Sequence, residues 1–275
     1  MTNKEAMMLN ATQNERTKEA QKQHRLKLTL ELALYGSLLP IFRGFSTDLR
    51  KHYAKHGNMI HTHDFRADVK KKLEKHYNKV SEKFAKTIVN KIGKPDNHDQ
   101  IIVSILTKTD IHNQLRAAES AKIIANTTHQ DMIESIIQAI NEVKTKGEQI
   151  TSKNVANIAE IRLKKKMHGR LTTIATTETN NPAEHTKQTE IDYLNHHDAI
   201  IKNEKIREKT KKKQWLAILD KVTRETHAES DMQIVDFNDA YIVDGEKLMY
   251  PGDMSLGASI GNTINCRCSS IIIID

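Results

Sequence analysis

In the first 170 residues, apolar side chains recur at steps of three or four positions. From Val69 to Ile88 this spacing forms one apolar stripe, which predicts a helix that ends at Gly93. Further helices are predicted over 101–122, 130–146 and, with a cap at Thr151 or Ser152, over about 152–167. The leucine-rich stretch 26–39 predicts a buried helix that Pro40 should end, because proline removes a backbone donor.

The pattern changes after Gly169, where we expect a domain boundary. Residues 172–179 are predicted to end in a turn at Asn180–Pro182. Residues 202–228 lack glycine and proline and predict one long helix with Trp215 on its core face. Short β-branched or aromatic segments follow at 234–237 and 240–243, and further strands are predicted at 246–250, after a turn, and at 270–274. Asp244-Gly245 is typical of a two-residue hairpin turn, so a small antiparallel sheet is expected.

Composition agrees with an α+β protein that is mostly helical, since there are only four prolines, ten glycines and 4% aromatic residues. We expect three parts: an N-terminal helical arm and apolar helix over 1–60, a helical region over 61–169, and a compact domain over 170–275. The most hydrophobic stretch, 26–45, is interrupted by charges and a proline, so no membrane association is expected. Both cysteines lie in one Cys-x-Cys, which fits a reducing compartment such as the cytoplasm.

Charge makes polyanions plausible partners. The 43 Lys and Arg residues exceed the 35 Asp and Glu residues, which gives a formal net charge of +8. Three stretches are especially basic: 66–90, 153–170 and 202–213. Such helices can contact DNA phosphates without reading sequence, or they can simply be solvated helix faces.

Cys266 and Cys268 are the main candidates for chemistry. If their loop folds back onto the helix that carries Asp220 and His227, thiolate, imidazole and carboxylate groups would supply ligands suited to a structural zinc ion. The fourth ligand stays open between Asp220, Asp253 and another histidine. Two other interpretations remain: inert buried cysteines beside a hydrogen-bonded histidine, or a redox-active pair. A thiolate nucleophile with a histidine base is a weaker alternative, because no substrate pocket is evident.

We predict a structural cluster around Trp215, formed with Arg224, Glu178 and Asp253. Asp220 and Arg224 are four positions apart, which would let them pair on one helix. Glu178 is a second carboxylate that could meet Arg224. We find none of the common hydrolase, kinase or dinucleotide-binding motifs, and we therefore expect no enzymatic activity.

The C-terminal motifs also carry a family resemblance. They are Lys213-x-Trp215-x4-Asp220-x3-Arg224-x2-His227, then Pro251-Gly252-Asp253, then Asn265-Cys266-Arg267-Cys268. In order and spacing they resemble the Mu F-like phage head morphogenesis family over about residues 170–275. The resemblance implies a minor head (capsid) protein of a tailed bacteriophage, and thus a role in virion assembly.

This resemblance implies partners and a location. The partners would be the portal protein, the major capsid protein or both, with an oligomeric state set by the portal vertex. The chain would lie in the virion, in the head interior or at the portal vertex, after assembly in the host cytoplasm, and it could accompany the DNA during ejection. The apolar helix is the predicted partner interface, through Leu34, Leu38, Leu39 and Phe42. The alternative function is a non-specific DNA-binding protein packaged with the viral genome.

Overall fold

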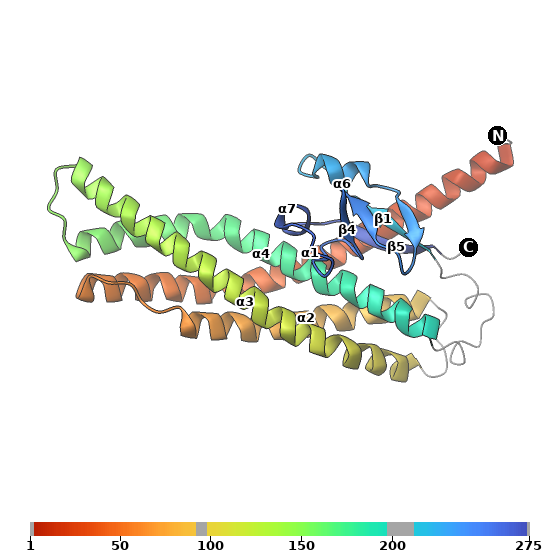
Figure 1. Cartoon of the computed structure of the whole chain (residues 1–275), viewed down its shortest axis with the longest axis horizontal. Coiled ribbons are helices and arrows are strands. Elements are labelled where there is room, and N and C mark those ends of the chain that lie inside the picture. The colour runs from red at the N-terminus through yellow and green to blue at the C-terminus, as the bar shows by residue number, and fades with distance from the viewer. Residues whose placement is uncertain (1–2, 92–97, 197–211, 274–275) are drawn as a thin grey trace. The chain divides into compact units, whose positions relative to one another are not determined.

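The computed structural model describes residues 3–91, 98–196 and 212–273 and has an α+β architecture, as the sequence predicted (Figure 1). Four long helices come first: α1 (Asn3–His56), α2 (His63–Lys91), α3 (His98–Thr145) and α4 (Ser152–His196). Short elements follow: β1 (Lys212–Leu216), α6 (Glu225–Glu229), β2 (Ile234–Asp236), β3 (Tyr241–Val243), β4 (Glu246–Leu248), α7 (Ile260–Thr263) and β5 (Ser269–Ile273).

Two small antiparallel sheets form near the C-terminus. In the first, β1 lies between β2 and β5, and Trp215 stands opposite Ser270. In the second, β3 pairs with β4 through the turn at Asp244 and Gly245. Both turn residues have positive φ angles, 52° and 74°, as the predicted hairpin dipeptide requires. Three of the four predicted strand segments contain β2, β3 and β4, and the fourth, 270–274, overlaps β5 from its second residue on.

The chain divides into two compact units. We call residues 1–31, 79–109 and 176–275 the C-terminal unit, and residues 32–78 and 110–175 the helical unit. These units differ from the predicted division at 60/61 and 169/170, because α1 to α4 each contribute residues to both.

The core of the helical unit contains the residues that were predicted to contact a partner. Leu34, Leu38 and Phe42 are buried in one cluster with side chains of α2, α3 and α4, and Leu39 packs against it. The predicted interface is therefore wrong for Leu34, Leu38 and Phe42, whose apolar surface is already covered within the unit, and it stays a prediction for the partly buried Leu39.

Three predicted helix boundaries are also wrong. Pro40 and Pro182 lie inside α1 and α4, and the predicted helices 101–122 and 130–146 are one continuous helix. A proline inside a helix forfeits one backbone hydrogen bond, which packing on both sides of it can offset. At the start of α4, in contrast, Thr151 accepts a hydrogen bond from the Asn154 N–H, as a predicted cap residue should.

The predicted long helix over 202–228 is replaced by β1, a turn and the short helix α6 in its described part; residues 202–211 lie outside the described residues. Pairing with β5 and β2 fixes Trp215 in an extended segment, whereas Val222, predicted on the same face, is 74% exposed. In the described part of the chain, no helix combines the length and apolarity needed to cross a membrane.

Candidate metal centre

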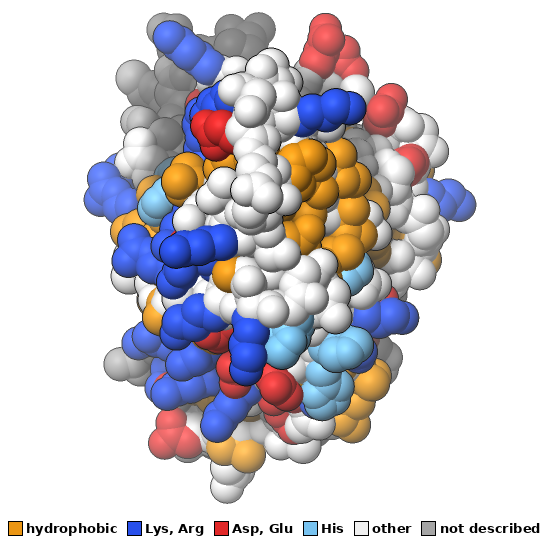
Figure 2. Space-filling view, turned by 90° about the vertical axis from the view of Figure 1, so that its left-hand side faces the viewer, with side chains coloured by type: hydrophobic (Ala, Val, Ile, Leu, Met, Phe, Trp, Pro, Cys, Tyr) orange, Lys and Arg blue, Asp and Glu red, His pale blue; other side chains and the backbone are white. Residues whose placement is uncertain are grey.

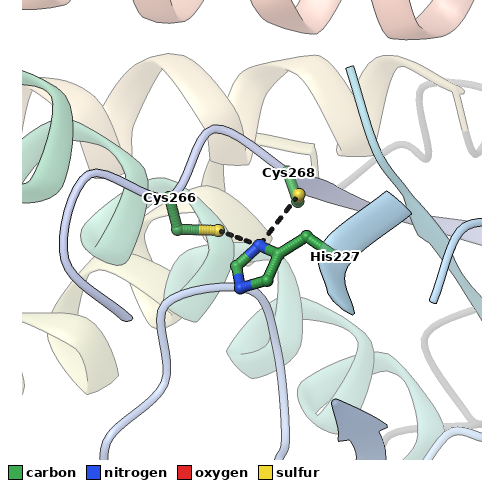
Figure 3. Close-up of side chains that lie close together, drawn as sticks. All are labelled: His227, Cys266 and Cys268. Carbon is green, nitrogen blue, oxygen red and sulfur yellow. Dashed lines mark hydrogen bonds between the residues drawn. The ribbon is translucent and has the colours of Figure 1, made fainter. Parts of the chain in front are cut away.

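Three motif residues meet inside the C-terminal unit. His227 lies on α6, and Cys266 and Cys268 lie between α7 and β5. The His227 Nδ1 is 3.8 Å from the Cys266 Sγ and 3.5 Å from the Cys268 Sγ, and Figure 3 shows both sulfurs pointing at this nitrogen. All three side chains are buried. The sequence predicted this trio, and the structure brings it together.

Local backbone contacts hold the cysteine loop in place. Asn265 adopts a left-handed φ of 55°, and its N–H donates to the Thr177 hydroxyl on α4 at 2.8 Å. One residue earlier, the Ile264 carbonyl accepts a 2.6 Å hydrogen bond from the Arg224 guanidinium. The loop is thus tied both to α4 and to the start of α6, which directs the two thiols at His227.

The two thiols titrate as an interacting pair. A hydrogen bond from Cys268, together with contacts to His227, lowers the pKa of Cys266 well below its ordinary value. The pKa of Cys268 is raised because it hydrogen-bonds and repels an ionised Cys266 and because it is buried. Cys266 is therefore the first of the two thiols to lose its proton.

Two sulfurs and one imidazole nitrogen form a donor set suited to a metal ion. The three ligand atoms lie within 4.8 Å of one another, and among the described residues no further His, Cys, Asp or Glu joins them. The His227 Nε2, on the other side of the ring, is buried and has no hydrogen-bond partner among the described residues. The residues present therefore fit a metal such as zinc.

Asp220 lies outside this trio. Its carboxylate forms a two-pronged ion pair with Arg267 at 2.6 and 2.7 Å, and this pair lowers the pKa of Asp220 to about 2. The predicted Asp220–Arg224 pair is replaced by this contact, because Asp220 precedes α6 and faces the cysteine loop. Glu178 is buried on α4, and its pairing with Arg224 stays a prediction.

Trp215 lies in the core of the C-terminal unit, and Asp253 binds the backbone of a turn. Trp215 is fully buried and meets the His227 ring edge-on, with ring centroids 5.7 Å apart. Asp253 is also buried, and its carboxylate accepts hydrogen bonds from the Met249 N–H at 2.9 Å and the Ser255 N–H at 2.8 Å. Both residues therefore have structural surroundings in this unit.

Two asparagines on α4 bind the Pro251-Gly252 turn. The Asn180 amide donates to the Pro251 carbonyl at 3.2 Å, and the Asn181 amide donates to the Gly252 carbonyl at 3.0 Å. Gly252 has a φ of 86°, and a side chain there would lie 3.4 Å from the Asn180 amide nitrogen. The sequence predicted a turn at these asparagines and did not indicate this role.

A buried ion network joins three segments of the C-terminal unit. Glu184 on α4 accepts from Lys27 at 2.7 Å and from Lys187 at 2.6 Å, and its side chain is 0% exposed. Its other oxygen accepts from the Ser270 N–H on β5 at 2.8 Å. Desolvation raises the pKa of Glu184, but the two lysines lower it more, so the net direction is down. The only sequence signal was a lysine inside a leucine-rich helix.

Lys213, the first residue of the C-terminal motif, is also buried. Its ammonium donates to the Met249 carbonyl at 2.6 Å and lies over the Phe237 and Tyr241 rings. Burial lowers the pKa of Lys213 to about 8, although Asp253 and Asp239 act in the opposite direction.

This lysine should make stability depend on pH. In the unfolded chain its pKa returns to 10.5, so unfolding takes up a proton between pH 8 and 10.5 and the free energy of unfolding should rise with pH there. Below this window both states are protonated, and Lys213 adds no slope. Urea unfolding at several pH values should show a shallower rise in Lys213→Met than in the natural chain. Identical pH profiles would contradict this assignment, since all other titrating groups are shared.

The basic clusters are only partly free to bind a polyanion. In 153–170, four cations form ion pairs with acids of α3 and α4: Arg162, Lys164, Lys166 and Arg170. Figure 2 shows one face of the molecule, on which Lys and Arg side chains lie among Asp and Glu side chains. Most of 202–213 lies outside the described residues. Because these cations already pair with acids, we interpret 153–170 as solvated helix faces and not as a phosphate-binding surface.

Comparison with known proteins gives one partial relative. The chain is 36% identical over 64 residues to the NAD(+)--arginine ADP-ribosyltransferase EFV of Enterococcus faecalis. The match covers 23% of this chain, and the chain spans only 12% of the length of that relative. No family model matches the chain, and no solved structure does.

Proposed function

We propose that the chain is a minor head protein of a tailed phage that associates with the portal or the inner capsid surface and assists head assembly. The observation that supports this proposal is the burial of the residues that carry the resemblance to the phage family. Trp215, His227, Asp253, Cys266 and Cys268 are all buried in the C-terminal unit, where they contact other protein groups. Such residues suit a rigid docking module better than a site that must admit a substrate.

We propose further that the Cys266, Cys268 and His227 trio holds zinc, which closes this module. Zinc would take two thiolates and one imidazole nitrogen from these residues, its fourth position would fall to water or another group, and its role here would be structural. Trp215 shields the imidazole from water, and the ties of Asn265 and Arg224 hold the loop for the ligands. One zinc per chain is expected by elemental analysis.

For the contact with portal or capsid we propose a surface on α3. Ile111 and Leu115 are 68% and 69% exposed, and they lie one helical turn apart. Covering two such side chains contributes enough free energy that replacing both should weaken association by roughly tenfold or more. The double variant Ile111→Ser/Leu115→Ser should therefore fail to sediment with portal or capsid assemblies. Ile161→Ser, at another exposed apolar position of the helical unit, should behave like the natural chain.

Salt separates this proposal from the DNA-binding alternative. Apolar association with capsid assemblies should persist at about 1 M salt, whereas contacts with phosphates weaken steeply as salt rises. If the double variant still sediments with assemblies and high salt releases both proteins, the minor head proposal fails in this form. The basic stretch 66–90 would then be the surface to test for DNA binding.

An ADP-ribosyltransferase activity is the second candidate, and the 64-residue match to the Enterococcus faecalis protein is what favours it. The match covers 12% of that protein, and its 64 residues are few for a complete catalytic domain. We expect no loss of NAD(+) when it is incubated with the purified chain and an arginine-rich protein. If NAD(+) were consumed in proportion to the concentration of the chain, ADP-ribosyltransferase activity would become the favoured function.

A further inference from the structure

Lys27 is a buried cation that contacts the metal-ligand loop from another segment of the chain. It lies on the part of α1 that belongs to the C-terminal unit, and its side chain is almost fully buried. Its ammonium donates to Glu184 at 2.7 Å, to the Ser269 hydroxyl at 2.6 Å and to Asn180 on α4. It also donates to the Cys268 carbonyl oxygen at 3.1 Å.

The contact with Cys268 links this lysine to the metal centre. Cys268 supplies one of the three ligand atoms, and its backbone carbonyl is fixed by Lys27 while its sulfur faces His227. Groups that orient metal ligands from outside the ligand set tune metal affinity, because a misplaced ligand must be reorganised on binding. Lys27 occupies this position although it is far from the cysteines in sequence.

We propose that Lys27 is a positioning residue of the metal centre, which holds Cys268 where its thiolate can share a metal ion with Cys266 and His227. Zinc affinity therefore depends on the docking of the α1 segment against β5 and α4. Because binding linkage is reciprocal, zinc must in turn stabilise that docking. This inference rests on the proposed zinc site.

Lys187 provides a matched control in the same network. It is also buried, it also pairs with Glu184, and it also donates to a β5 carbonyl, that of Ser270 at 2.8 Å. Neither Glu184 nor Ser270 is a ligand residue. Replacing Lys187 therefore removes a buried cation without removing a contact to Cys268.

The experiment compares the full chain with Lys27→Met and Lys187→Met, using competition with a chromophoric chelator to measure zinc affinity. Lys27→Met should weaken zinc binding by roughly 10- to 100-fold, and Lys187→Met by less than about threefold. Cobalt(II) added in place of zinc should give weaker tetrahedral absorption bands in Lys27→Met than in Lys187→Met. Equal losses in both variants, or none in Lys27→Met, would overturn the inference. A natural chain that takes up no zinc would overturn the zinc proposal itself.

A second measurement needs no variant, which matters if Lys27→Met does not fold. Hydrogen exchange of the α1 backbone over residues 18–31 is followed in the natural chain with and without zinc. Slower exchange in this segment on zinc addition is the result that reciprocal linkage predicts. Zinc binding that leaves exchange in 18–31 unchanged would contradict the proposed coupling.

Discussion

Glu184→Gln should lower the free energy of unfolding by about 3–5 kcal/mol, which is the usual effect of breaking a buried ion pair from one side. The glutamine keeps the shape of the side chain but leaves Lys27 and Lys187 as uncompensated buried cations. It also weakens the acceptor for the Ser270 N–H on β5. Urea unfolding followed by circular dichroism measures the change.

Asp220→Asn is the matched control for that experiment. Its pair with Arg267 has similar distances, 2.6 and 2.7 Å, but the Asp220 and Arg267 side chains are 39% and 23% exposed. Water and salt screen such a pair, so the loss should stay below about 1 kcal/mol. If Glu184→Gln were as mild as Asp220→Asn, the buried network would not be a main support of the C-terminal unit.

Trp215→Ala should destabilise the chain by about 3–5 kcal/mol, because it removes the largest fully buried side chain and leaves a cavity. The indole packs edge-on against both His227 and Tyr241, so its loss also loosens the wall of the metal centre. Thermal and urea unfolding give the size of the effect.

Val222→Ala distinguishes the observed structure from the helix that the sequence predicted. On that helix Val222 would share the core face with Trp215, and its truncation would cost on the order of 1 kcal/mol or more. In the structure Val222 is exposed, so the change should remain within about 0.5 kcal/mol. A large destabilisation by Val222→Ala would contradict the β1 assignment.

Local patterns were sufficient to predict much of the C-terminal sheet. The Asp244-Gly245 hairpin depends on two adjacent residues that tolerate positive φ, and the Tyr-Ile-Val segment before the turn has β-forming composition. β1 could not be found in this way, because its strand state depends on pairing with β5, more than 50 residues later. Without that partner, the stretch around Trp215 has the composition of a helix.

Burial of polar groups was the second feature that the sequence could not reveal. The α4 segment 176–190 is rich in threonine, asparagine and charged residues, yet most of it is buried. Its side chains bind groups on α1, β5 and the Pro251 turn, and such pairings follow no period. The grouping of His227, Cys266 and Cys268 was predictable from residue chemistry, whereas Asp220, chosen for the same chemistry, pairs with Arg267.

The proposal of a minor head protein is tested most directly by mass spectrometry of purified tailed-phage particles from the organism that encodes the chain. The chain should be present at a few copies per particle, far below the major capsid protein, and its level after DNA ejection tells whether it leaves with the genome. Complete absence from intact, DNA-filled particles would contradict the assignment to the virion.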